Sequence, residues 1–280
     1  MTWAATRDLV DAAVARRRAV PAFNVITIEQ AEAVVGGAED AGVASLIQVS
    51  QNAIAFRSGF APLLAACREL ARAASVPIGL HVDHLDDQEL ALAVTDHADE
   101  LGVGSLMFDL ATLPYDENVA LTARIAAAGH ARGLVVEGEL GEVGGKDGAH
   151  APGVRTDPDE AAAFADDTGI DLLAVAVGSS HAMVERAAVL DLDLIERLAE
   201  AVSVPLVLHG SSGVADALLG DAVEAGIRKV NVGTVLGVVG TGRLRTELAE
   251  HPDAVDPRAY LRGMREATRA EVARLAAVVG

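Results

Sequence analysis

Short apolar runs rich in Val, Ile and Leu alternate along the chain with longer, Ala-rich stretches whose apolar residues recur every three to four positions. The first pattern is typical of strands buried on both faces, and the second of amphipathic helices packed against a sheet. Eight strands are predicted, at residues 20–25, 44–49, 78–83, 105–108, 134–139, 172–177, 206–209 and 229–232. The predicted helices span residues 28–41, 60–74, 86–101, 118–132, 159–168, 192–201, 215–225 and 235–250.

This regular alternation predicts a parallel sheet, and eight strand–helix units in 280 residues predict a (β/α)8 barrel. Several predicted helices are followed by a Gly just before the next strand, as at Gly42 and Gly169, which is a usual stop signal. No linker or shift of composition divides the chain, so residues 1–280 are expected to form one domain. Pro257–Val279 is expected to add a C-terminal helix.

Three histidines, His84, His181 and His209, each follow an apolar run that is read as a strand. In a parallel barrel all strand ends open onto one face, so three imidazoles from distant parts of the sequence can meet on one divalent metal ion. Three protein ligands leave a coordination position for substrate, which is typical of catalytic zinc. The alternative is that each His is an ordinary polar residue at a strand end.

The charge balance restricts the classes of partner and of chemistry. The formal net charge is −19, with 22 basic and 41 acidic residues, which argues against nucleic acid as a partner. Only Lys146 and Lys229 are lysines, so a Schiff-base mechanism has two candidates at most. An anionic substrate would have to be held by backbone amides, helix N-termini or a few placed Arg.

The location of the protein is inferred from cysteine usage and from the N-terminus. Cys67 is the single cysteine, so a disulfide framework is excluded and a reducing cytoplasm is expected. The first ten residues carry charge and no apolar core of a signal peptide, and the apolar runs are too short to span a membrane.

Other polar residues cluster at the predicted strand ends. His81 and Asp83 share strand parity, so both are expected to point into the barrel, where Asp83 could move protons or orient a ligand His. The segments Gly210-Ser211-Ser212 and Asn231-Val232-Gly233-Thr234 follow the last two strands, where barrels often bind phosphate. Asn24 ends the first strand and could reach the same ligand or simply form a turn.

A Gly-rich loop over residues 141–153 follows Glu137 and Glu139. At the carboxyl end of a barrel strand, such a loop is interpreted as a lid over the site, the alternative being a disordered surface excursion.

The segments VPAFNVITIEQA, HVDH, LMFD, VEGELGEVGG, LAVAVGSSH, VPLVLHGSSG and KVNVGT occur in this order along almost the whole chain. In these segments the sequence resembles the zinc-dependent class II aldolases, which cleave fructose or tagatose bisphosphates and related ketose phosphates. The resemblance implies zinc on His84, His181 and His209, with Asp83 as the acid–base group. The resemblance also implies an alternative metal position at Glu139. A monovalent cation is a possible second cofactor besides the zinc. The substrate contacts that the resemblance implies are Asn24, Ala182, Gly210, Ser211, Ser212, Asn231, Val232, Gly233 and Thr234.

Four departures from the family pattern bear on the substrate. In one, the stretch Met-Val-Glu-Arg at residues 183–186 stands where the family often has a Lys or Tyr. Ala182 stands where the family usually has Gly, next to the substrate phosphate. The lid reads Gly144-Gly-Lys-Asp-Gly148, one residue shorter and without the Glu that the family uses for proton transfer. Val235 replaces an acidic residue. None of these changes touches the three histidines.

The sequence therefore predicts a zinc-dependent, cytoplasmic lyase that cleaves a ketose phosphate or bisphosphate to dihydroxyacetone phosphate and an aldehyde. A homodimer or homotetramer is expected, with no nucleic acid or membrane partner. Two alternatives are a metal-dependent hydrolase on the same barrel and a non-catalytic accessory subunit of the family.

Overall fold

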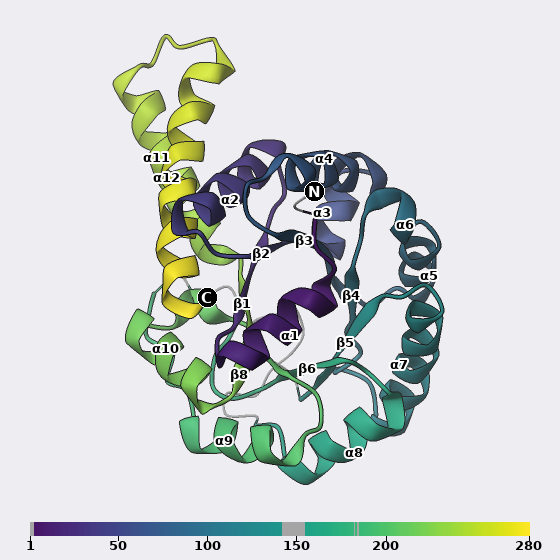
Figure 1. The fold of residues 1–280 in the computed structure, drawn as a ribbon. Coiled ribbons are helices and arrows are strands. Elements are labelled where there is room, and N and C mark those ends of the chain that lie inside the picture. The colour runs from purple at the N-terminus through teal and green to yellow at the C-terminus, as the bar shows by residue number, and fades with distance from the viewer. Residues whose placement is uncertain (1–2, 142–154, 182, 184) are drawn as a thin grey trace.

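Eight parallel strands form a closed barrel in the order β1 to β8, surrounded by helices (Figure 1). The computed structural model describes residues 3–141, 155–181, 183 and 185–280. The strands are β1 (Val20–Asn24), β2 (Ser45–Ser50), β3 (Ile78–Leu85), β4 (Ser105–Phe108), β5 (Val135–Leu140), β6 (Leu172–Val175), β7 (Leu206–Leu208) and β8 (Ile227–Val232). The predicted (β/α)8 barrel with a C-terminal helix is confirmed.

The helices that alternate with the strands follow the predicted order. They are α2 (Ile28–Ala41), α4 (Ala61–Ala73), α5 (Gln88–Asp96), α6 (Ala98–Leu101), α7 (Tyr115–His130), α8 (Pro158–Thr168), α9 (Leu192–Ala201), α10 (Asp216–Ala225), α11 (Thr234–Glu250) and α12 (Pro257–Val279). The helix predicted at 86–101 is divided in two at His97, whose backbone leaves the helical region and whose ring bonds to the Ala93 carbonyl.

Two helices were not predicted, α1 (Thr6–Arg16) and α3 (Gln51–Phe56). Helix α1 lies across one end of the barrel in Figure 1 and packs Leu9, Val10 and Ala13 against the interior core. The Trp3 bridge to Ile78, at the start of β3, places this end at the amino ends of the strands. Helix α1 therefore closes the barrel opposite the strand ends that carry the histidines.

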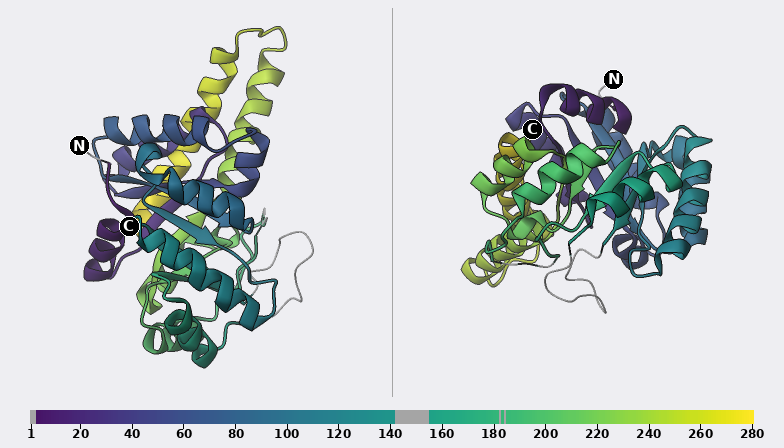
Figure 2. Two further views of the ribbon diagram at one scale, coloured as in Figure 1. Left: turned by 90° about the vertical axis from the view of Figure 1, so that its right-hand side faces the viewer. Right: turned by 90° about the horizontal axis from the view of Figure 1, so that it is seen from below.

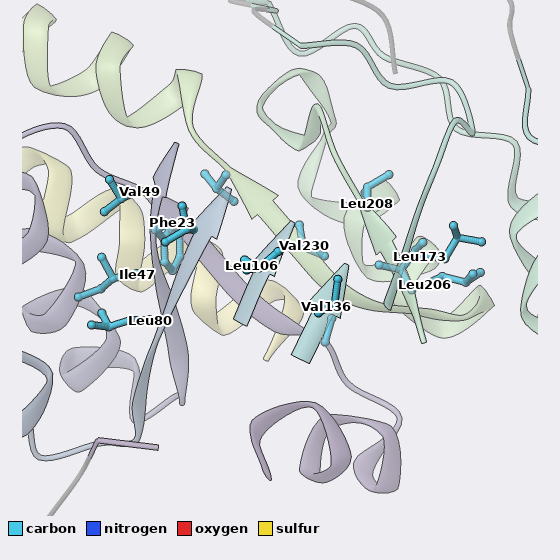
Figure 3. Packing of buried hydrophobic residues seen from close by; sticks show 14 of the residues in the cluster. Phe23, Ile47, Val49, Leu80, Leu106, Val136, Leu173, Leu206, Leu208 and Val230 are labelled. Carbon is cyan, nitrogen blue, oxygen red and sulfur yellow. The ribbon is translucent and has the colours of Figure 1, made fainter. Parts of the chain in front are cut away.

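The barrel interior is apolar at its amino end and polar at its carboxyl end. Because side chains alternate along a strand, every second residue points inward. The apolar interior layer consists of Ala22, Leu46, Met107, Val135, Leu172, Ala174 and Val207. Two positions further along the same strands lie Asn24, Gln48, Glu137 and His209. His81 pairs with Gln48, Asp83 pairs with Ser50, and Asn231 pairs with Ala22. The intervening residues, including Phe23, Ile47, Leu106 and Val136, face outward and pack beneath the helices (Figure 3).

The last two helices form an antiparallel hairpin that projects beyond the barrel (Figures 1 and 2). The inner part of α12 packs on α2 at Gly36 and Gly37, where a Cβ on Gly37 would lie 2.6 Å from the Arg269 carbonyl oxygen. The described helices include none long and apolar enough to cross a membrane.

Candidate active site

Strand β3 brings two neighbouring residues, Asp83 and His84, to the same site. Strand alternation alone would place them on opposite faces. The register of β3 against β4 shifts between Val82 and Leu85, and His84 adopts a left-handed φ of 50°. Such an irregularity redirects a side chain at a strand end. As a result, His84 Nε2 lies 4.0 Å from Asp83 Oδ2.

The structure brings His84, His181 and His209 together, although they come from three different strand ends. Their ring centroids are 4.7 Å apart for His84 and His209, 5.0 Å for His84 and His181, and 5.7 Å for His181 and His209. One ring nitrogen from each residue lies within 4.8 Å of the other two. Three converging imidazoles are a ligand set that suits zinc.

Carboxylates fix the orientation of two of these rings. His84 Nδ1 lies 2.8 Å from Asp109 Oδ2, and His209 Nε2 lies 2.9 Å from Glu137 Oε1. A carboxylate accepts a hydrogen bond from N–H, so the remaining nitrogens, His84 Nε2 and His209 Nδ1, carry lone pairs. These two nitrogens face each other at 3.0 Å. Two facing lone pairs repel unless a cation lies beside them, and a carboxylate behind each imidazole is the usual arrangement around zinc.

The buried charges also fit a divalent cation. Among the described residues, three buried carboxylates, Asp83, Glu137 and Glu139, accompany one buried ammonium group, that of Lys229. The formal balance of this cluster is therefore −2. Because buried charges need compensation, the residues present fit a bound metal of charge +2. Burial lowers the pKa of His209 to about 4, which keeps its imidazole in the neutral form that a metal requires.

Asp109 is a residue that sequence reasoning did not single out. It follows β4, and with His84 and Glu139 it forms a second group whose ligand atoms lie within 4.8 Å of one another. The sequence could have identified Asp109, because it comes directly after an apolar run that is predicted to be a strand, as the three histidines do. Glu139 thus lies near His84 and Asp109, in a second group of potential metal ligands.

Asp83 is held by two amides. Asn24 Nδ2 donates to Oδ2 at 2.7 Å, and Asn231 Nδ2 donates to Oδ1 at 3.4 Å. Gln48 in turn donates to the Asn24 carbonyl oxygen at 3.1 Å. Burial opposes ionisation of Asp83, but the neighbouring imidazoles, above all His84, outweigh it and hold the pKa well below its usual range. Asp83 is therefore an oriented, ionised carboxylate beside the three histidines.

The two segments proposed to hold phosphate lie side by side at the carboxyl ends of β7 and β8. Ser211–Gly213 forms a short 3-10 helix, and Ser212 Oγ accepts a hydrogen bond from Val235 N at 3.1 Å. Ser211 Oγ donates to the Asn231 carbonyl. Gly210 has a φ of 66°, and a Cβ there would lie 2.6 Å from the Ser180 carbonyl. The loop that carries His181 thus packs directly on the Gly210–Ser212 turn.

Gly233 and Thr234 begin α11, with Gly233 at its N-cap. Val232 is buried at the end of β8. The sequence expectations for Ala182 and for the lid at residues 141–153, apart from Gly141 itself, lie outside the described residues.

Residues 4–280 match the family model for class-II fructose-bisphosphate aldolase. This chain belongs to the class II fructose-bisphosphate aldolase family. The match covers nearly the whole chain, so it includes every residue of the site described above.

Solved structures of class II aldolases agree with this assignment. The YdjI aldolase from Escherichia coli K12 is 30% identical, with a TM-score of 0.85 over 99% of this chain and 97% of that one. A candidate fructose-1,6-bisphosphate aldolase from Coccidioides immitis is 29% identical, with a TM-score of 0.87 over 98% and 95%. The fructose-bisphosphate aldolase of Campylobacter jejuni, at 21% identity, shares the fold with a TM-score of 0.80 over 96% and 92%.

Membership in this family explains the polar carboxyl end of the barrel. Class II aldolases are generally zinc-dependent, and the chain has histidine and carboxylate groups able to hold a metal. Lys229 Nζ lies 2.8 Å from Glu137 Oε2 and 2.8 Å from Asn231 Oδ1. An ammonium group held in this way is a poor Schiff-base nucleophile, which favours the metal-dependent class of aldolase over the lysine-dependent one.

Proposed function

We propose that this protein is a zinc-dependent aldolase that cleaves a ketose 1-phosphate to dihydroxyacetone phosphate and an aldehyde. The observation that carries the proposal is the convergence of three imidazoles, two of them oriented by carboxylates, beside the ionised Asp83. In this proposal His84, His181 and His209 hold the metal, Glu139 serves an alternative metal position, and residues 1–280 act as one domain.

The proposed chemistry assigns proton transfer to Asp83. As the C3–C4 bond breaks, its electron pair moves to the dihydroxyacetone phosphate half, and the C4 hydroxyl proton passes to the Asp83 carboxylate, which releases the aldehyde. When bound, zinc supplies Lewis acidity that stabilises the negative charge developing on the donor half. Asn24 and Asn231 hold Asp83 in place for the proton transfer.

The donor phosphate is proposed to lie between Gly210–Ser212 and Asn231–Thr234. These residues bring together a tight turn and the N-terminus of the 17-residue helix α11. Backbone N–H groups at a helix start favour a dianion even in an acidic protein. Val232 and Gly233 are proposed to contribute backbone, and Ala182 is proposed to adjoin the phosphate.

We assign the acceptor side of the site to the loops that follow β1, β2 and β3, which differ in charge from the proposed donor side. In the described loops that follow β1, β2 and β3, Arg57 is the one basic residue, and its guanidinium donates to the Ile26 carbonyl at 2.8 and 3.0 Å. Asp86 and Asp87 lie in the same region, next to Gln51. This environment supports an aldehyde without a phosphate of its own.

The direct test is retro-aldol cleavage by the purified protein alone. We expect turnover of a ketose 1-phosphate to stop on treatment with a chelator and to return with zinc or cobalt. Hydrolysis without release of dihydroxyacetone phosphate would indicate the metal-dependent hydrolase. Bound zinc without turnover of any ketose phosphate would favour the accessory subunit.

The metal assignment is tested by His181→Ala. Two imidazoles make a poor site, so this variant should lose its stoichiometric zinc, whereas His97→Ala, at an exposed helix junction, should retain it. Metal analysis after dialysis makes the comparison. Stoichiometric zinc in His181→Ala would overturn the proposed ligand set.

The projecting hairpin supports the proposal of a homo-oligomer. Its outer part carries exposed apolar side chains, Leu248 and Val255, at a distance from the barrel core. Its residues 234–280 hold seven arginines against six carboxylates, while the rest of the chain is strongly acidic. An almost neutral arm on an acidic barrel is suited to lie against the barrel of a second copy.

A further inference from the structure

Lys229 is fully buried inside the barrel and has no part in the proton transfer proposed above. A buried ammonium group is unfavourable unless charges and hydrogen bonds compensate it. Lys229 lies two residues before Asn231 on the same face of β8. It is therefore deeper in the barrel than the proposed metal ligands and does not lie beside the substrate. Its retention in the core therefore needs an explanation.

The Lys229 ammonium group makes two hydrogen bonds that lead to two different parts of the site. One bond goes to Glu137 Oε2 at 2.8 Å, and the other oxygen of Glu137 lies 2.9 Å from His209 Nε2. The second bond goes to Asn231 Oδ1, also at 2.8 Å. Asn231 Nδ2 lies 3.4 Å from Asp83 Oδ1 and 3.1 Å from His209 Nε2. Because His209 Nε2 directs its hydrogen at Glu137, Asp83 is the acceptor for the Asn231 amide. One cation thus orients both a carboxylate behind a histidine and an amide behind the acid–base group.

We propose that Lys229 is a positioning residue that sets the tautomer of His209 and the orientation of Asn231. Lys229 donates a hydrogen bond to Glu137 Oε2, so that Glu137 Oε1 accepts from His209 Nε2–H. His209 Nδ1 is then left with its lone pair directed toward His84. Lys229 also donates to the Asn231 carbonyl oxygen, which forces the amide NH2 group toward Asp83. The inference rests on the proposed function, because it assumes that His209 Nδ1 binds the metal.

The arrangement accounts for two features at once. The carboxylate of Glu137 is fully buried, and the Lys229 ammonium group at 2.8 Å supplies its counter-charge. The amide of Asn231 has no rotational preference of its own, so a donor on one side and an acceptor on the other decide its orientation. Without Lys229, Glu137 would lose its counter-charge and Asn231 could turn its carbonyl oxygen toward the Asp83 carboxylate.

The test uses cobalt as a spectroscopic substitute for zinc in the full-length protein. Lys229→Met keeps the length of the side chain and removes the charge. We expect its affinity for Co²⁺, measured by competition with a chelator, to fall about 10- to 100-fold, the range found when partners of metal ligands are removed. The visible spectrum of bound Co²⁺ should change as well. The matched control is Val272→Ala, a buried change in α12 that lowers stability away from the site and should leave both readouts unchanged.

A second variant keeps the proposal testable if Lys229→Met does not fold. In the double variant Lys229→Met, Glu137→Gln the buried pair is neutral, but the Gln amide has two orientations behind His209. We expect a weakened Co²⁺ site with an altered spectrum here too. In either folded variant, Co²⁺ affinity within twofold of the wild type with an unchanged spectrum would overturn the proposal.

The Schiff-base alternative for Lys229 is separated by trapping. Borohydride reduction of the wild type in the presence of dihydroxyacetone phosphate should leave the protein mass unchanged, whereas an adduct on Lys229 would overturn the positioning role. Failure of the proposed function is recognised from the wild-type protein alone. A wild-type protein that binds no Co²⁺ or cleaves no ketose phosphate fails before any Lys229 variant is compared.

Discussion

At the scale of single residues, Asp83 combines the two properties that a proton-transferring group needs. Its carboxylate is oriented by Asn24 and Asn231, and the surrounding imidazoles keep it ionised despite full burial. Asp83 is next to His84 in the sequence, but it does not belong to the group of three histidines whose ring nitrogens converge. Its removal should therefore affect proton transfer more than metal binding.

Asp83→Asn tests this separation. The substitution keeps the shape of the side chain and removes the proton acceptor, so turnover should fall about 10²- to 10⁴-fold while zinc remains bound. The same change at an exposed helix position, Asp116→Asn, should leave turnover unchanged. Steady-state kinetics and metal analysis of both proteins decide the matter. A variant that has lost its zinc would show that Asp83 supports the ligands rather than moving the proton.

The residues of this site were predictable where a strand end alone marks them. Several site residues follow apolar runs, and a barrel directs such positions to one face. They are His84, His181, His209, Asp83 and the Gly210–Ser212 turn. Partnerships across the interior were not predictable in this way. The bonds from Glu137 to His209 and to Lys229 join residues 72 and 92 positions apart, and only closure of the sheet brings β5, β7 and β8 around one interior.

At the scale of elements, the sequence pattern recovered helices with a clear apolar face and missed those without one. Helix α1 mixes charged residues with few large apolar side chains, so its period is weak, and its burial depends on closing the barrel end. Helix α3 has six residues, too few for a periodic signal. The start of β8 at Ile227 instead of residue 229 shows that strand ends depend on pairing with neighbours, here β7.

The packing of α12 on α2 depends on a close approach at Gly37. A Cβ there would lie 2.6 Å from both the Arg269 carbonyl oxygen and Val272 Cβ, so Gly37→Ala should force the helices apart and cost about 1–3 kcal/mol of stability. Gly220→Ala is the matched control, because Gly220 lies in α10 with open space around its Cβ position. That change should stabilise the protein by up to about 1 kcal/mol. Denaturant unfolding measures both, and a Gly37→Ala protein as stable as Gly220→Ala would contradict the packing argument.

At the scale of the whole molecule, the charge distribution bears on the substrate. The chain carries a net charge of −19, and residues 234–280 hold seven of its basic residues. The barrel that contains the site is therefore even more acidic than the chain as a whole. A strongly acidic field disfavours polyanions unless local groups compensate. The proposed donor side has helix α11 and the Gly210–Ser212 turn for one phosphate, whereas Arg57 on the proposed acceptor side is bonded to the Ile26 carbonyl.

This asymmetry predicts that the ketone donor must be phosphorylated and that the aldehyde need not be. In the cleavage direction, a ketose 1-phosphate and the corresponding 1,6-bisphosphate should have comparable kcat/KM, because the described loops of the proposed acceptor side offer the second phosphate no basic residue other than Arg57. The unphosphorylated ketose serves as the control and should be cleaved far more slowly than either. The comparison belongs at low and at high salt, since screening should help the bisphosphate more. A preference for the bisphosphate of more than about 100-fold corresponds to roughly 2.7 kcal/mol of differential transition-state binding. That result would require a second phosphate site, supplied by residues outside the described loops that follow β1, β2 and β3.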